Sequence, residues 1–193
     1  SRCSDVSVEE SVNLIPGEEE MTTFFEDETG HGTSIAGVIA GNGEDTEVVG
    51  INKNVLLYSA KVLDANNTAP VSRIVEGIYW AIDNDVDIIN MSFGTKTDSK
   101  VLKNAVEKAI KKGILVVAAV GNNEKQGVLY PAAYDGVLGV GSVDTKAVHS
   151  EFSAKGDAVD VVAVGEQGVS SGLFDGIVVA EGTSMAVPQV VAE

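Results

Sequence analysis

An uninterrupted apolar run from Ile114 to Val120 constrains the fold of this chain more than any other feature. The run follows a stretch that ends at Gly113 and in which apolar residues recur at helical spacing, namely Leu102, Ala105, Val106, Ala109 and Ile110. An apolar run of this kind is typical of a central strand in a parallel sheet, because helices cover both faces of such a strand. The sequence therefore predicts an α/β fold.

The same alternation of strand and helix continues along most of the chain. Apolar, β-branched segments predict strands at Val55–Val62, Val86–Met91, Val137–Val143 and Val159–Val164, and a short one at Ser11–Leu14. One helix is predicted from His31 to Gly41, and a second has Pro70 in its first turn. A third helix is predicted after Ser99, which caps it, and the last begins near Ser184. We expect one domain, with a mostly parallel central sheet and helices on both faces.

Charge and cysteine content exclude several classes of function. The chain has 13 basic and 29 acidic residues, a formal charge of −16, which opposes binding to nucleic acid or to anionic membrane surfaces. The single cysteine, Cys3, excludes an intrachain disulfide and a cysteine–histidine metal cluster. No apolar run approaches the roughly 20 residues that span a membrane. We therefore expect neither a nucleic-acid partner nor membrane association.

Three residues stand at turns where side-chain chemistry is accessible. His31 lies between Gly30 and Gly32 at the start of a helix, and it is either a general base or an ordinary surface histidine. Ser184 stands at the start of the last helix, where the dipole stabilises developing negative charge, although a serine there is also a common N-cap. Asn122 follows the central strand, as a turn residue or as a donor to an oxyanion.

Taken together, these segments closely resemble the histidine, asparagine and serine motifs of the subtilisin-like serine peptidases, the subtilases. The matching segments are His31-Gly32-Thr33, Gly121-Asn122 and Gly182-Thr183-Ser184-Met185-Ala186. Residues 60–63, 77–82, 89–94 and 130–132 also look like family segments and occur in the family's order. The resemblance covers nearly all of residues 26–193. It implies a subtilisin-like fold and a serine endopeptidase that acts on polypeptides.

The resemblance also implies a role for each residue of the motifs. His31 is expected to be the general base and Ser184 the nucleophile that forms an acyl-enzyme. The side-chain amide of Asn122 and the backbone N–H of Ser184 are expected to hold the oxyanion. Residues 67–71 resemble the strand edge that pairs with extended substrate.

The primary specificity pocket is also implied by the resemblance. Its walls are expected to be Ser92, Phe93 and Gly94 on one side, with Ala119 and Gly121 on the other. Phe93 and the apolar character of these walls suggest an apolar residue before the scissile bond. The peptide bond between Tyr130 and Pro131 resembles one that is cis in the family.

The chain departs from the family pattern in its third catalytic residue. The family's aspartate lies in an Asp-Ser-Gly or Asp-Thr-Gly motif upstream of the histidine, and neither tripeptide occurs here. Asp5 looks more like a later family segment, and Asp27 belongs to the acidic stretch before the histidine. We therefore expect a partial domain that lacks the first strand, with its aspartate, and the C-terminal part. Such a chain is expected to be weakly active or inactive, and to pair with a missing segment or self-associate.

Several properties stay open at the level of the sequence. Catalysis by these residues requires no cofactor. Structural calcium is expected at most in the loop 42–46, with Glu44 and Asp5 as candidates, and a solvated acidic turn is the alternative. His149 is expected to lie in a loop. The compartment is not readable from the residues, and the resemblance favours secretion. Alternative functions are a non-catalytic subtilase-like domain that binds peptides or serves as a scaffold, and a generic α/β binding protein.

Overall fold

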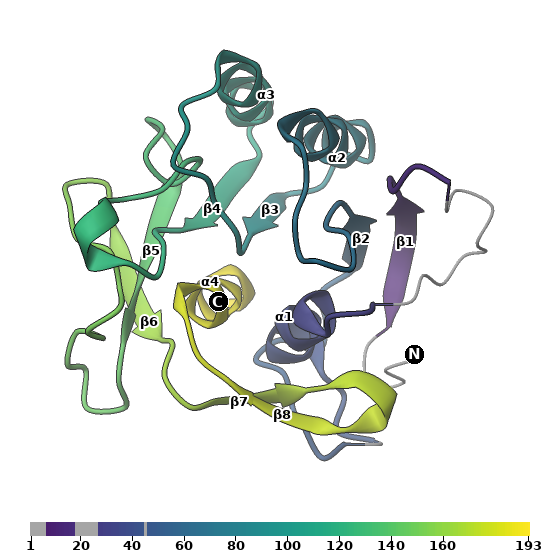
Figure 1. Ribbon diagram of the computed structural model, residues 1–193. Coiled ribbons are helices and arrows are strands. Elements are labelled where there is room, and N and C mark those ends of the chain that lie inside the picture. Colours follow the sequence, from purple (N-terminus) through teal and green to yellow (C-terminus); the bar gives the residue numbers. More distant parts are fainter. Residues whose placement is uncertain (1–6, 18–26, 45) are drawn as a thin grey trace.

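The protein is described by a computed structural model that covers residues 7–17, 27–44 and 46–193 (Figure 1). Its strands are β1 (Val8–Asn13), β2 (Leu57–Lys61), β3 (Ile88–Met91), β4 (Leu115–Ala119), β5 (Leu138–Val143), β6 (Val161–Val164), β7 (Gly168–Ser171) and β8 (Ile177–Ala180). Its α-helices are α1 (His31–Ala40), α2 (Val71–Asp83), α3 (Lys100–Lys111) and α4 (Thr183–Ala192). Short 3-10 turns lie at Glu124–Gln126 and Leu173–Asp175.

The predicted central strand, β4, is buried on both of its faces. One face joins a core cluster with α2 and α3, through Val116, Ala118 and Val120. The other face packs against α4, through Val117 and Ala119. Figure 1 shows α2 and α3 on one side of the strands and α4 on the other. The predicted α/β class is therefore confirmed, with helices on both faces of a parallel sheet.

The local signals in the sequence place most of the elements correctly. The hydroxyl of Ser99 accepts a hydrogen bond from the Leu102 N–H at 3.4 Å and so caps α3, while Pro70 directly precedes α2. The Tyr130–Pro131 bond is cis, as expected. The antiparallel hairpin of β7 and β8 was not predicted, because each strand has only four residues and those of β7 are mostly small and polar.

The parallel strands form two separate ladders in the described part of the chain. One ladder pairs β1 with β2, and the other runs in the order β3-β4-β5-β6. No ladder among the described residues joins β2 to β3, and we call this gap between the two ladders the interruption of the sheet. In Figure 1, β2 lies on one side of the interruption and β3 on the other. That a strand is missing from the sheet stays a prediction. None of the described helices is long and apolar enough to cross a membrane.

Candidate active site

The carboxylate of Asp27 holds the start of α1, and therefore the backbone of His31. One oxygen of Asp27 accepts the Gly30 N–H at 2.8 Å. The other accepts the Thr33 N–H at 2.9 Å and the Thr33 hydroxyl at 2.8 Å. Gly30 has a φ of 76°, a left-handed conformation that glycine adopts without strain. These bonds satisfy N–H groups of the first turn that no helical carbonyl can reach.

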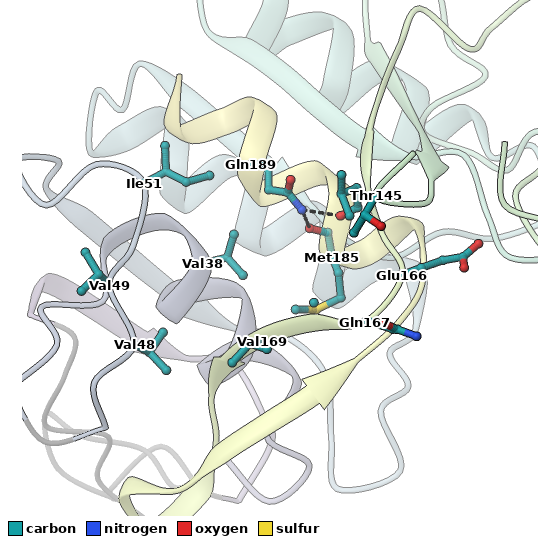
Figure 2. A pocket seen from close by; sticks show the side chains of 12 residues that line it. Val38, Val48, Val49, Ile51, Thr145, Glu166, Gln167, Val169, Met185 and Gln189 are labelled. Carbon is teal, nitrogen blue, oxygen red and sulfur yellow. Dashed lines mark hydrogen bonds between the residues drawn. The ribbon is translucent and has the colours of Figure 1, made fainter. Parts of the chain in front are cut away.

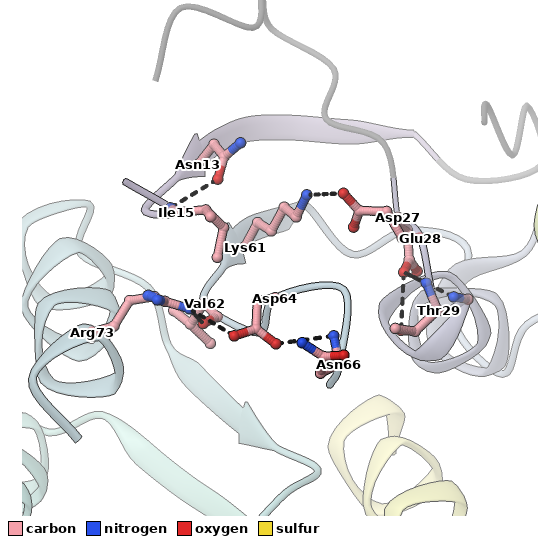
Figure 3. A network of polar contacts seen from close by, with 11 residues as sticks. Asn13, Ile15, Asp27, Glu28, Thr29, Lys61, Val62, Asp64, Asn66 and Arg73 are labelled. Atoms are coloured by element: carbon pink, nitrogen blue, oxygen red, sulfur yellow. Dashed lines mark hydrogen bonds and ion pairs between the residues drawn. The ribbon is translucent and has the colours of Figure 1, made fainter. Parts of the chain in front are cut away.

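The same hydrogen bonds determine the charge of Asp27. Burial by itself raises the pKa of this carboxyl, but the hydrogen bonds from Thr33, Gly30 and Thr29 outweigh it and hold the pKa below its usual range. Next to Asp27, the Glu28 carboxylate pairs with the Lys61 ammonium at 3.0 Å, which ties this segment to the end of β2 (Figure 3). Asp27 therefore acts as a charged cap of the helix that carries His31.

The imidazole of His31 contacts the predicted specificity pocket. Its Nε2 lies 3.1 Å from the carbonyl oxygen of Ser92, the first residue after β3. A carbonyl can only accept, so Nε2 carries the hydrogen in this contact. Among the hydrogen bonds of the described residues, none joins His31 to the Ser184 hydroxyl. Catalytic hydrogen bonds are often long or poorly aligned without substrate, so the contact does not exclude His31 as a base.

Ser184 is the second residue of α4 and its side chain forms no helix cap. The cap position belongs to Gly182, at a φ of 135°. Thr183 and Met185 on either side are buried, whereas Ser184 is partly exposed. The alternative that Ser184 is an ordinary N-cap is therefore wrong. Its hydroxyl lies in the first turn, where the helix dipole favours negative charge.

Thr183 determines which way the amide of Asn122 points. The Asn122 Oδ1 accepts both the Thr183 N–H and the Thr183 hydroxyl, each at 2.8 Å. The hydroxyl oxygen of Thr183 in turn accepts the Gly121 N–H at 3.3 Å. Because the amide oxygen is used twice, the amide nitrogen is the end that faces away from Thr183. The motif around Ser184 by itself indicates no role for Thr183, and only the contact between distant segments reveals one.

The amide nitrogen of Asn122 and the hydroxyl of Ser184 converge beside Gly182. A Cβ atom placed on Gly182 would lie 2.8 Å from Asn122 Nδ2 and 3.2 Å from Ser184 Oγ. A side chain at position 182 would therefore fill the space that these two groups share. A hydrogen-bond donor and a hydroxyl close to each other are what acyl transfer needs for its oxyanion and its nucleophile.

The helices that carry His31 and Ser184 pack directly against each other. Their shared apolar cluster contains Ile35, Ile39, Ala40, Met185 and Ala192. Figure 1 shows α1 and α4 side by side. The relative position of the predicted base and nucleophile therefore depends on this helix pair.

The residues predicted to form the specificity pocket follow two neighbouring parallel strands. Met91 of β3 pairs with Ala118 of β4, so Ser92 and Gly94 leave the sheet beside Ala119 and Gly121. Phe93 is only partly buried and packs against the main core cluster. It therefore belongs in part to the core. Whether these residues bind substrate stays a prediction.

The segment 67–71 is a turn followed by the first residue of α2, so it is not a strand in this structure. Asp64 shapes the turn by accepting the Asn66 N–H at 3.0 Å and the Thr68 N–H at 3.2 Å. Arg73 lies 3.9 Å from the Asp64 carboxylate and donates to the Val62 carbonyl at 3.0 Å (Figure 3). This network anchors the turn to α2 and leaves pairing with substrate as a prediction.

The calcium expectation finds little support among the described residues. They contain no group of three or more acidic, histidine or cysteine side chains that could hold a metal ion. In the loop that contains Glu44, the Lys53 ammonium donates to the Asn42 carbonyl at 2.9 Å, where it opposes a second cation. The other candidate, Asp5, lies outside the described residues. Calcium binding by this loop stays a prediction.

A cavity of about 230 Å³ lies away from the predicted catalytic side chains, between α1, the loop before β2, β7 and α4 (Figure 2). Its lining is mostly apolar and includes Val38, Val48, Val49, Ile51, Val169 and Met185. At its edge, the Gln189 amide donates to the carbonyls of Val164 and Met185. His31, Asn122 and Ser184 do not line it, so we assign it no part in catalysis.

Comparisons with known proteins agree with the predicted family and fold. The model of the subtilase family matches residues 2–192. Subtilisin DY from Bacillus licheniformis is 40% identical over 191 residues, 97% of this chain and 68% of its own. The minor extracellular protease Epr from Bacillus subtilis (strain 168) is 39% identical over 172 residues, 89% of this chain and 27% of its own. The crystal structure of a cold adapted subtilisin-like serine proteinase superposes with a TM-score of 0.82 at 31% identity.

The coverage of these relatives is uneven. The superposition with the cold adapted proteinase includes 94% of this chain and 65% of that one. Two further curated relatives are matched over 46% and 49% of their length. The chain therefore spans about half to two thirds of most of the proteins that it resembles.

Proposed function

The chain belongs to the subtilase family of serine endopeptidases, and from that premise we propose that it carries the reactive centre of a peptidase with Ser184 as nucleophile. The observation that supports this most strongly is the convergence of Asn122 Nδ2 and Ser184 Oγ beside Gly182. The substrates are polypeptides, as the family implies.

In the proposed reaction, Ser184 Oγ attacks the carbonyl carbon of the scissile peptide bond. His31 takes the hydroxyl proton at a ring nitrogen that carries no hydrogen, as the new C–O bond forms. Nε2 can do this only after it has lost its hydrogen and released the Ser92 carbonyl. The negative charge that develops on the carbonyl oxygen is stabilised by the Asn122 amide and the Ser184 N–H. The C–N bond then breaks, and His31 returns the proton to the leaving amine. Water hydrolyses the acyl-enzyme by the same steps, with no cofactor.

We further propose that residues 1–193 alone are weakly active or inactive. Among the described residues, no carboxylate is hydrogen-bonded to His31, so none stabilises the imidazolium that forms when His31 takes a proton. In the related triad of chymotrypsin-type enzymes, replacing the aspartate lowers turnover about 10⁴-fold. The interruption between β2 and β3 is consistent with a strand that would complete the site.

A chromogenic peptide substrate tests this proposal. We expect slow hydrolysis or none by the 193-residue chain, and any hydrolysis should be lost in Ser184→Ala. Rapid turnover that Ser184→Ala abolishes would refute the weak activity while supporting the nucleophile. Hydrolysis that survives Ser184→Ala would refute the nucleophile itself.

A non-catalytic peptide-binding or scaffold domain is the second candidate. The contact between His31 Nε2 and the Ser92 carbonyl favours it, because it directs the imidazole toward the pocket wall. The two candidates differ in one readout: a binding domain would retain a fluorescent peptide without cutting it, even in a longer chain that carries an aspartate motif. Ser184-dependent cleavage in that longer chain would exclude a purely binding role.

We also propose that the protein is secreted, since one relative bears the name of an extracellular protease. The high negative charge supports the expectation of no nucleic-acid partner and no membrane association. Structural calcium stays a prediction for the loop with Glu44 and Asp5. A melting temperature that rises with added calcium would support it, because a ligand stabilises the state that binds it.

A further inference from the structure

Leu129 lies in a segment that is hydrogen-bonded to both walls of the predicted specificity pocket. Its N–H donates to the Val120 carbonyl at 2.9 Å, at the end of β4. The next residue, Tyr130, exchanges two hydrogen bonds of 2.8 Å with Thr95, which directly follows the other wall. The backbone of Leu129 is therefore fixed between the segments that carry Gly94 and Gly121.

The side chain of Leu129 contacts the backbone of both of these glycines. A Cβ atom on Gly94 would lie 2.9 Å from the Leu129 Cβ. A Cβ atom on Gly121 would lie 2.7 Å from the Leu129 Cγ and 2.8 Å from its Cδ1. Any side chain at either position would overlap with Leu129. Gly94 and Gly121 have no side chains, and Leu129 occupies the space that this leaves between the two walls.

Core packing does not account for this position. The neighbouring side chains of Val128 and Tyr130 both pack against the main core cluster. Leu129 is only partly buried and is not among the described side chains of that cluster. Val128 also lies near Gly156, at 3.3 Å from the place of a Cβ atom there, and so points elsewhere. Leu129 thus presents its side chain to the pocket.

We propose that Leu129 makes this pocket shallow and restricts the residue before the scissile bond to a small, uncharged side chain such as that of Ala or Ser. The inference rests on the proposed function, and it makes small size, rather than apolar character, the property for which this pocket selects. A phenyl ring entering between Gly94 and Gly121 would have to displace the leucine, because close-packed side chains leave no room for it. Since one methylene changes discrimination about 10- to 200-fold, we expect Ala to be preferred over Phe by at least about tenfold in kcat/KM.

The test compares two peptides that differ only in having Ala or Phe before the scissile bond. The unaltered chain should prefer Ala, and Leu129→Ala should shift the Phe-to-Ala ratio of kcat/KM toward Phe by at least about tenfold. The matched control is Val128→Ala, which shortens the neighbouring apolar side chain without opening the space between the glycines. The control should leave the ratio unchanged. Each ratio compares the two peptides on the same preparation of one variant, so a partial loss of folded protein lowers both kcat/KM values equally and does not alter the ratio.

A second measurement keeps the test decisive if turnover is slow. Dissociation constants of the same two fluorescent peptides are measured in Ser184→Ala and in the double variant with Leu129→Ala, where nothing is cut. The same tenfold shift in preference is expected. A preference for Phe in the unaltered chain, or a ratio that Leu129→Ala does not move, would overturn the inference and leave the proposed function standing. Absence of both peptide binding and Ser184-dependent cleavage would overturn the proposed function, and the inference with it.

Discussion

At the scale of single residues, the orientation of the Asn122 amide is the most informative detail of the site. Asn122 and Ser184 could be predicted as a pair from their motifs. The part played by Thr183 could not be predicted, because it depends on contacts to Gly121 and Asn122 across about sixty residues of chain. No local sequence pattern encodes such a contact. The space beside Gly182 likewise emerges only when the two segments meet.

Removing the Thr183 hydroxyl should disturb the oxyanion donor more than substrate binding. We expect Thr183→Val to lower kcat with little change in KM, because the amide of Asn122 loses one of the bonds that orient it. The expected loss is smaller than the roughly 10²–10³-fold that follows removal of the donor itself, a magnitude for which subtilisin is the reference case. Steady-state kinetics on the residual activity measure it.

The conservative variant separates positioning from mere stability. Thr183→Ser keeps the hydroxyl and should restore kcat to near that of the unaltered chain. If Thr183→Val and Thr183→Ser reduce kcat equally, or if only the melting temperature changes, the hydroxyl does not position the amide.

The charge of Asp27 predicts a pH-dependent contribution to stability. The pKa of Asp27 is lower in the folded chain than in the unfolded chain, where it is about 4. The carboxylate therefore stabilises the fold at pH values above the unfolded pKa, and this stabilisation is lost as the pH falls through the folded pKa. Asp27→Asn imitates the protonated carboxyl. At pH 7 we expect this variant to unfold more easily by about 1 kcal/mol, as for loss of a helix cap.

Denaturant unfolding as a function of pH measures the effect. The difference between Asp27→Asn and the unaltered chain should shrink as the pH is lowered below about 4. Asp157→Asn, at an exposed position, is the control and should stay within about 0.5 kcal/mol at each pH. A difference for Asp27→Asn that is the same at pH 7 and at pH 3 would contradict the charged cap.

At the scale of the elements, the strongly periodic segments could be predicted and the irregular ones could not. Strand β4 and helices α2 and α3 have apolar patterns that match their burial, so sequence and structure agree to within a few residues. The hairpin of β7 and β8 was missed because each strand has only four residues, and the two buried residues of β7, Ser170 and Ser171, are polar. The turn at 64–70 depends on side chain to backbone bonds of Asp64, which compete with a regular strand.

The packing of α1 on α4 gives a prediction about the helices that hold the site. Ile39, which is 5% exposed, lies in the cluster with Met185. Ile39→Ala should lower the free energy of unfolding by about 2–5 kcal/mol, since it deletes buried methylene groups and leaves a cavity. The control is Ile177→Ala on β8, where the side chain is 59% exposed. Its effect should be within about 0.5 kcal/mol. Equal effects of the two substitutions would mean that Ile39 does not stabilise the helix pair.

At the scale of the whole molecule, the fold class could be predicted but the order of the strands could not. Periodicity identifies strands and helices one at a time, whereas strand order depends on which edges meet in space. The separation of β1 and β2 from the ladder β3 to β6 is therefore a finding of the structure. In the same structure, the proposed nucleophile, oxyanion donor and base stand on different elements, and no described carboxylate is hydrogen-bonded to His31.

The most direct test of this account is labelling of the 193-residue chain with a fluorophosphonate, followed by mass spectrometry to locate the label. Such a reagent phosphonylates a serine hydroxyl whose oxygen is activated beside an oxyanion site. We predict slow labelling confined to Ser184, slower still in His31→Ala and absent in Ser184→Ala. A label on another residue that persists in Ser184→Ala, or a Ser184 that stays unlabelled in a longer chain that carries an aspartate motif, would contradict the claim that Ser184 is the nucleophile.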